Sequence, residues 1–135
     1  MASDNEEAHL YEELFIHWMR MSFKKDIISI MKWIDDVATM GRERQKRLLG
    51  FGLNVFRESL MLNYGAAEAV HMDGNLLKFT KKFAPFFNEV NCLRFTEEFN
   101  LAIGHIERNA NPKILFLDLS VKVIQFLLAK PSLLK

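Results

Sequence analysis

The sequence contains a single cysteine, Cys92, so it can form neither an intrachain disulfide framework nor a zinc site built from cysteines. It has only 6 Gly and 3 Pro among 135 residues, which disfavours a turn-rich all-β fold. No uninterrupted apolar run exceeds four residues, as in Ile114–Leu117, whereas a membrane-spanning helix needs about 20. The formal net charge is +1, so the overall charge does not point to nucleic acid as a partner.

The N-terminal residues, Met1–Ala8, are acidic and contain no apolar segment, so a secretory signal peptide is not expected. A lone cysteine is also typical of proteins in a reducing compartment. The sequence therefore predicts an intracellular protein with no membrane partner.

Apolar residues are abundant, at 50% of the chain, and charged residues make up 26%, which is typical of one globular domain of this length. Their spacing of three and four residues predicts helices in nearly every segment. The fold class is therefore all-α, a compact bundle of five main helices and one short helix. The expected ranges are 5–22, 24–39, 42–63, 76–84 (short), from Asn88 or Asn91 to 109, and 112–129. Residues 64–75 lose the periodicity and are predicted to form the main loop.

Local signals mark several helix boundaries. Ser3 or Asp4 is a suitable N-cap for the first helix, and Gly41 is expected to end the second one. Pro85 is expected to interrupt the short helix. Asn111 followed by Pro112 is a favoured helix start. In the third helix, Gly50 and Gly52 cost helix stability but often permit the close approach of another helix.

No motif in the sequence predicts catalysis, a cofactor or a metal. A glycine-rich phosphate loop is absent. Glu13 and His17 have ligand spacing on one helical face, but no third ligand follows, so a solvated surface pair is the better interpretation. His105 is predicted to lie at a helix end near its dipole, and Cys92 is predicted to be a core residue. A small metal-binding helical bundle would need a repeated Glu-x-x-His pattern, which is also absent.

Two basic clusters allow two interpretations. Arg42–Arg47 holds four cations and one anion at the start of the third helix, where cations oppose the helix dipole. It is either a solvated helix turn or a contact for phosphates or an acidic partner. Lys78, Lys81 and Lys82 form a second cluster with the same alternatives. A helical nucleic-acid-binding module that uses residues 42–47 and 78–82 is therefore one functional hypothesis.

The last helix has only a narrow polar stripe, formed by Asp118, Lys122 and Gln125. Such a helix must be covered on almost all sides, either by its own domain or by a partner. The third helix has a second apolar stripe that includes Phe51 and Val55, so it is expected to touch neighbours on two sides. The predicted partner interface consists of Arg42, Arg44, Arg47, Phe51, Val55, Lys122 and Gln125.

Several stretches resemble the C-terminal part of the clamp-loader subunits of bacterial DNA polymerase III, and most closely those of the delta-prime type. The main one is IERN-ANPKILFLDLS at 106–120. Further agreement is found, in the same order, in WMRMSFKK at 18–25, GRERQ at 41–45, RESL at 57–60 and KFAPF at 82–86. The resemblance covers most of residues 10–128.

The resemblance implies a helical collar domain, which in this family follows a two-domain AAA+ module that is not part of this chain. Residues 1–9 would then lead from a linker or fragment start into the first helix, 10–129 would form the single collar domain, and 130–135 a tail. Five collar domains from different subunits pack in a ring while the AAA+ modules place the sliding clamp on primed DNA. The implied partners are subunits of the gamma/tau and delta types, with DNA contacted only indirectly, in the bacterial cytoplasm. Weak self-association of the isolated domain is also expected.

Overall fold

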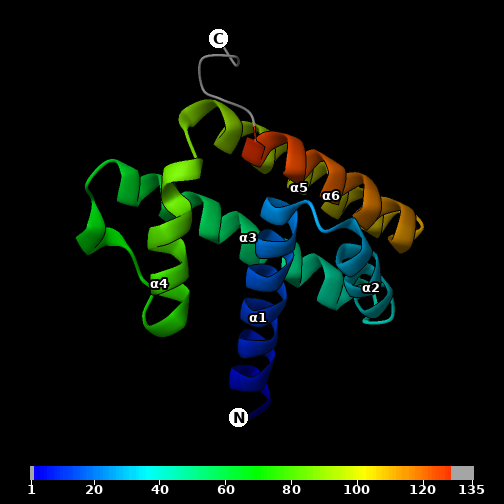
Figure 1. The fold of residues 1–135 in the computed structure, drawn as a ribbon. Helices are drawn as coiled ribbons and strands as arrows, with labels where there is room; N and C mark the ends of the chain where they lie inside the picture. The colour runs from blue at the N-terminus through cyan, green and yellow to red at the C-terminus, as the bar shows by residue number, and fades with distance from the viewer. Residues whose placement is uncertain (1, 129–135) are drawn as a thin grey trace.

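The computed structural model describes residues 2–128, with side chains from Glu6 onward (Figure 1). Its elements are α1 (Ala2–Lys24), α2 (Ile27–Ala38), α3 (Arg42–Asn63), the 3-10 helix η1 (Ala67–Ala69), α4 (Gly74–Phe83), the 3-10 helix η2 (Ala84–Phe86), α5 (Glu89–Glu107) and α6 (Pro112–Leu128). The predicted all-α fold is confirmed, and no strand occurs in residues 2–128. Residue 129 and the predicted tail at 130–135 lie outside the described residues. Within the described range, no helix combines the length and apolar character that crossing a bilayer requires.

Asparagine side chains define the starts of the last two helices. Asn88 Oδ1 accepts two hydrogen bonds of 2.9 Å from backbone N–H groups of the first turn of α5. Asn91 Oδ1 in turn accepts from the backbone N–H of Asn88 at 2.7 Å, so both predicted caps are used, as two halves of one capping box. At α6, Asn111 caps two backbone N–H groups and Pro112 is the first helical residue, as predicted.

The starts of α1 and α2 differ from the prediction. α1 begins before Ser3 and Asp4, which therefore lie inside the helix and do not cap it. Lys25 has a positive φ of +59°, which interrupts the helical conformation between α1 and α2. Asp26 was expected inside the second helix but is its N-cap, because Asp26 Oδ1 accepts the Ser29 N–H at 3.1 Å. The second helix therefore starts three residues later than its apolar periodicity suggested.

The turn between α2 and α3 also corrects a prediction. Gly41 does not end α2, which ends at Ala38. It precedes α3 with φ +90°, a conformation that favours glycine. The Gln45 side chain then donates to the Val37 carbonyl at 3.0 Å, which also accepts from the Met40 backbone N–H at 3.1 Å. One residue of α3 thus contacts the end of α2.

The predicted loop at 64–75 is shorter in the structure and partly helical. It contains η1, and α4 already begins at Gly74, two residues before the expected start. Pro85 falls in η2, which continues α4 by one 3-10 turn. The irregular part of the predicted loop is therefore limited to the residues on either side of η1, and α4 with η2 leads on to α5.

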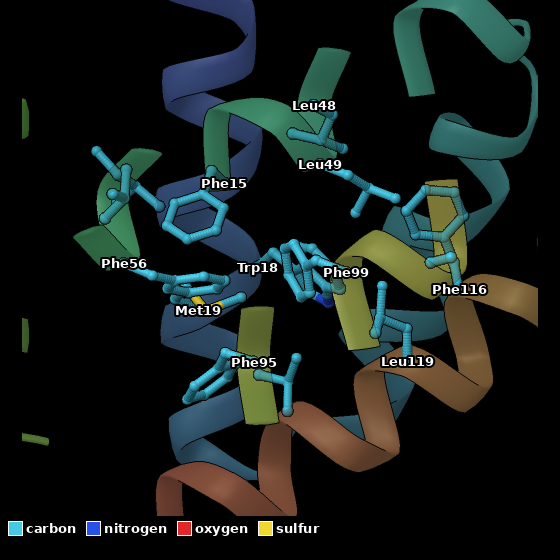
Figure 2. Packing of buried hydrophobic residues seen from close by; sticks show 14 of the residues in the cluster. Phe15, Trp18, Met19, Leu48, Leu49, Phe56, Phe95, Phe99, Phe116 and Leu119 are labelled. Atoms are coloured by element: carbon cyan, nitrogen blue, oxygen red, sulfur yellow. The ribbon is translucent and has the colours of Figure 1, made fainter. Parts of the chain in front are cut away.

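The core is aromatic and is centred on Trp18 of α1 (Figure 2). The indole of Trp18 stacks on Trp33 of α2, with ring centroids 4.6 Å apart, and on Phe99 of α5 at 5.5 Å. Its Nε1–H donates to Ser120 Oγ of α6 at 2.9 Å, which satisfies the one polar group that this ring buries. Four helices therefore meet at a single side chain.

α3 is the most extensively covered helix. It packs against α5, α1 and α4, and it crosses behind α1 in Figure 1. A Cβ atom added at Gly52 would lie 2.7 Å from a ring carbon of Phe99 and 2.8 Å from one of Phe15. Nothing lies within 4 Å of the corresponding position at Gly50. The close approach that the two glycines suggested is therefore found at Gly52 alone.

Candidate protein-interaction surfaces

A stripe of exposed apolar side chains follows the outer side of α6. It consists of Ile114, Leu117, Val121 and Leu128, which are spaced so that they share one side of the helix. Ile114 is 69% exposed and Leu117 is 39% exposed. The inward side holds the buried residues Leu115, Phe116, Leu119, Ser120, Val123 and Leu127. The described residues thus cover α6 on one side and leave the other apolar side open.

α2 extends this apolar stripe, because it packs against α6 and has exposed apolar residues of its own. A groove of about 140 Å³ lies between the helices, lined by Met31 together with Ile114 and Leu117. Lys113 Nζ lies 3.4 Å from Asp35 Oδ1, so an ion pair of exposed side chains joins the two helices there. The seven exposed apolar residues, here called the α2–α6 face, are Ile27, Ile28, Met31, Ile114, Leu117, Val121 and Leu128.

The size of the α2–α6 face is sufficient for a partner. From the exposed fractions of its side chains, it presents on the order of 500 Å² of apolar surface. The largest apolar patch on a typical monomer measures about 300–600 Å² and is often functional. A stable interface buries about 800 Å² on each partner, of which the apolar centre is only a part. Lys113, Asp118, Lys122 and Gln125 supply polar groups at its edge.

The basic run Arg42–Arg47 is largely paired within the domain. Arg47 Nη1 lies 3.0 Å from Glu7 Oε1, and Arg44 Nε lies 3.6 Å from the same oxygen. Arg42 donates to the Asn109 side chain, and Lys46 contacts Glu43 at 3.0 Å and Glu107 at 3.7 Å. These contacts join the start of α3 to α1 and to the end of α5. The positive charge available to phosphates is correspondingly reduced.

Glu7 is the acceptor at the centre of this arrangement. The Tyr11 hydroxyl donates to its carboxylate at 2.6 Å. That hydrogen bond, followed by the contacts with Arg47 and Arg44, lowers the pKa of Glu7. Burial and the bond to Glu7 raise the pKa of Tyr11. The predicted contact residues Arg44 and Arg47 therefore hold the N-terminal part of α1 in place, although both side chains remain exposed.

The other predicted interface residues do not form one surface. Val55 is fully buried and belongs to the core, so it presents no surface to a partner in this structure. Phe51 is half-buried against Phe15, with ring centroids 5.9 Å apart. Lys122 and Gln125 lie on α6, beside the exposed stripe. Of the seven predicted residues, only these two adjoin the α2–α6 face.

The Lys122 ammonium group forms two ion pairs, one with α5 and one within α6. Its Nζ lies 2.8 Å from Glu98 Oε1 of α5 and 2.9 Å from Asp118 Oδ2 of α6. The bonds to these carboxylates raise the pKa of Lys122. Lys122 therefore links α6 to α5 at the edge of the apolar stripe.

The cysteine and histidine candidates from the sequence have no catalytic arrangement among the described residues. Cys92 is buried, and burial raises the pKa of its thiol. Glu13 pairs with His9 at 3.0 Å, and His17, its predicted companion, is not part of that pair. His105 lies in the last turn of α5, as predicted. Among residues with described side chains, no three His, Cys, Asp or Glu groups gather as metal ligands would.

The α2 half of the α2–α6 face was not predicted as a contact region. The signal was available, because Ile27, Ile28 and Met31 make the start of α2 apolar on more than its inward side. The sequence could not reveal which neighbour covers that side. Only the packing of α2 against α6 brings the two apolar stripes together.

No protein-family model matches the chain, and no curated protein or solved structure is significantly similar to it.

Proposed function

We propose that this chain is the collar domain of a bacterial clamp-loader subunit, most like delta-prime, and that it serves as an assembly scaffold. The observation that carries the proposal is the α2–α6 face. An apolar surface of this extent is costly to leave in water and is typical of a protein contact site. The ordered stretches that resemble clamp-loader subunits supply the identity of the assembly.

The resembling stretches have structural roles that fit a shared fold. Trp18, in the stretch at 18–25, is hydrogen-bonded to Ser120, in the stretch at 106–120. Gln45, in the stretch at 41–45, donates to a carbonyl at the end of α2.

In this role the chain contributes contacts and no reaction of its own. Its partners are subunits of the gamma/tau and delta types, which meet it in the bacterial cytoplasm. The contact surface proposed here differs from the one predicted from sequence, because the α2–α6 face takes the place of α3. The apolar centre supplies most of the free energy of association, and the polar edge selects the partner.

The test is reconstitution of the assembly from purified gamma/tau-type and delta-type subunits and this chain, followed by sedimentation. A double variant, Leu117→Ser with Val121→Ser, removes two residues from the centre of the α2–α6 face. The matched control, Leu93→Ser with Val90→Ser, makes the same two changes on the exposed side of α5. Both variants should retain wild-type helicity, since all four side chains are exposed.

The α6 variant should bind at least about tenfold more weakly than wild type, and the α5 variant should bind normally. Equal binding by the two variants would show that the α2–α6 face is not the contact. If the wild-type chain binds none of these subunits, the clamp-loader proposal itself fails.

A further inference from the structure

A second surface, on the other side of α1 from α2, has a different chemistry (Figure 1). A groove of about 200 Å³ lies between the last turns of α1 and the segment formed by α4 and η2. Phe79 and Phe83 line its buried part, and Phe23 and Phe86 stand at its exposed part. We call it the aromatic groove. It shares no residue with the α2–α6 face.

The rings of the aromatic groove hold one another in position. Phe23 meets Phe86 edge-to-face, with centroids 4.8 Å apart, and Phe79 meets Phe83 at 4.9 Å in the same manner. Edge-to-face contacts of this kind are favourable beyond the burial of area, so they fix the relative orientation of the rings. Phe23 and Phe86 nevertheless remain 44% and 42% exposed. The groove is therefore formed before any ligand arrives, and its apolar content is not fully covered.

The rim of the aromatic groove is positive. Arg20, Lys24 and Lys82 line it, and no acidic residue does. Arg20 lies over the ring of Phe79, 5.9 Å from its centroid. None of the three cations forms an ion pair with the residues whose side chains the structure describes. This distinguishes the rim from the run at 42–47, where carboxylates from α1, α3 and α5 approach the cations.

We propose that the aromatic groove binds an acidic peptide segment of a partner protein that inserts one or two large apolar side chains. The volume is below the roughly 300–1,000 Å³ of small-molecule sites, but it suits the side chains of a peptide. Apolar anchors in a groove between helices are a common mode of peptide recognition. Carboxylates that flank such anchors would meet the three unpaired cations of the rim.

Charge and aromatic rings also attract single-stranded nucleic acid, but the arrangement here favours a peptide. Bases stack on open ring faces, which nonspecific single-strand binders present along an extended positive channel. In the aromatic groove, the rings turn their edges and faces toward one another. The opening is a short recess between two helices. This inference concerns a different surface from the collar contact and stands independently of it.

The experiment is a selection from a displayed library of random peptides on the full chain. Enriched peptides should carry net negative charge together with Phe, Leu, Ile or Met. Their affinity should fall at least about tenfold for Lys82→Glu and for Phe86→Ala. The controls are Lys32→Glu, which makes the same charge change on α2, and Leu93→Ala, which removes an exposed apolar side chain from α5. Both controls should bind as wild type.

Lys82 is exposed, so Lys82→Glu keeps the test decisive even if Phe86→Ala alters the fold. The proposal is overturned if no acidic peptides are enriched, or if the enriched peptides bind Lys82→Glu as tightly as wild type. It is also overturned if a thymidine oligonucleotide occupies the groove in place of peptides. In that case its binding would fall steeply with salt and be lost in Lys82→Glu.

Discussion

The inner helix α3 carries apolar residues on two sides and the outer helix α6 carries them around most of its circumference, yet only α3 is covered on all of its apolar sides. Among the described residues, no large apolar side chain of α3 is exposed, whereas four on α6 are. α3 has α1, α4 and α5 around it, while α6 has its neighbours on one side. Apolar residues on more than one side of a helix thus accompany a covered helix in α3 and an open surface in α6.

What separates the two helices is how closely their neighbours approach. At Gly52 the missing side chain lets Phe15 of α1 and Phe99 of α5 meet over the backbone of α3. The outer side of α6 has bulky Ile, Leu and Val at the corresponding places, and no described element lies over them. Apolar residues on more than one side therefore indicate that a helix needs cover. On α3, Gly52 marks a place where the domain itself supplies that cover, whereas Gly50 faces open space.

The largest expected difference is between two leucines that lie two positions apart on α6. Leu119 is 3% exposed and faces the core, so Leu119→Ala should cost about 2–5 kcal/mol of unfolding free energy. Leu117→Ala, on the outer side, should cost less than about 1 kcal/mol. Urea denaturation followed by circular dichroism measures both. Equal losses would mean that α6 is covered on both sides.

The glycines of α3 should respond with opposite signs. Gly52→Ala forces a Cβ atom against two fully buried rings, and overpacking of this kind typically costs about 1–3 kcal/mol. Gly50→Ala places its Cβ in open space and should stabilise the chain by about 0.5–1 kcal/mol, because alanine favours the helix. The measurement is the urea midpoint of each variant. A shared sign would show that Gly52 does not mark the close approach.

Replacing a buried polar side chain of α3 should change the stability more than replacing a partly exposed one of α6. The Glu58 side chain is almost fully buried, and its Oε2 has no hydrogen-bond partner among the described atoms. Glu58→Met replaces it with an apolar side chain of similar length and should stabilise the domain by about 1–3 kcal/mol. Thermal unfolding measures the change. Destabilisation would show that the contact of Glu58 Oε1 with Arg57 Nη2, 3.8 Å away, outweighs the cost of burying the carboxyl group.

The smallest effect is expected for Lys122→Gln on α6. The carboxylates of Glu98 and Asp118 raise the pKa of Lys122, so the ion pairs stabilise the fold below the ordinary lysine pKa of 10.5. This stabilisation is lost as the pH rises through the higher pKa of the folded state. Lys122 is partly exposed, so the variant should lose well under about 1 kcal/mol at neutral pH. A difference from wild type that persists above that pKa would contradict the electrostatic origin.

Much of the fold could be predicted because its signals are local. The cap at Asn111 and the pair Asn88 and Asn91 act on backbone groups two or three residues away. The roles of Gly41 and Asp26 were predicted wrongly, because a glycine or an aspartate between two helices can end the first helix or cap the start of the second. Only the path of the chain decides between them.

The candidate surfaces were harder to predict because they depend on contacts between distant segments. Val55 belongs to an apolar stripe in the sequence, yet the neighbours of α3 bury it completely. The pairing of Arg44 and Arg47 with Glu7 joins residues about forty positions apart. Helical periodicity predicts which side of a helix is apolar, but it does not indicate which other element covers that side.

The stacked pair Trp18 and Trp33 gives this protein a built-in optical probe. They are the 2 tryptophans of the chain, and their indoles lie 4.6 Å apart with an interplanar angle of 20°. Two chromophores in such contact couple electronically, and one of them is also hydrogen-bonded to α6. Near-ultraviolet circular dichroism and intrinsic fluorescence therefore report on the junction of α1, α2 and α6. Any rearrangement of that junction caused by docking on the α2–α6 face would therefore be visible without a label.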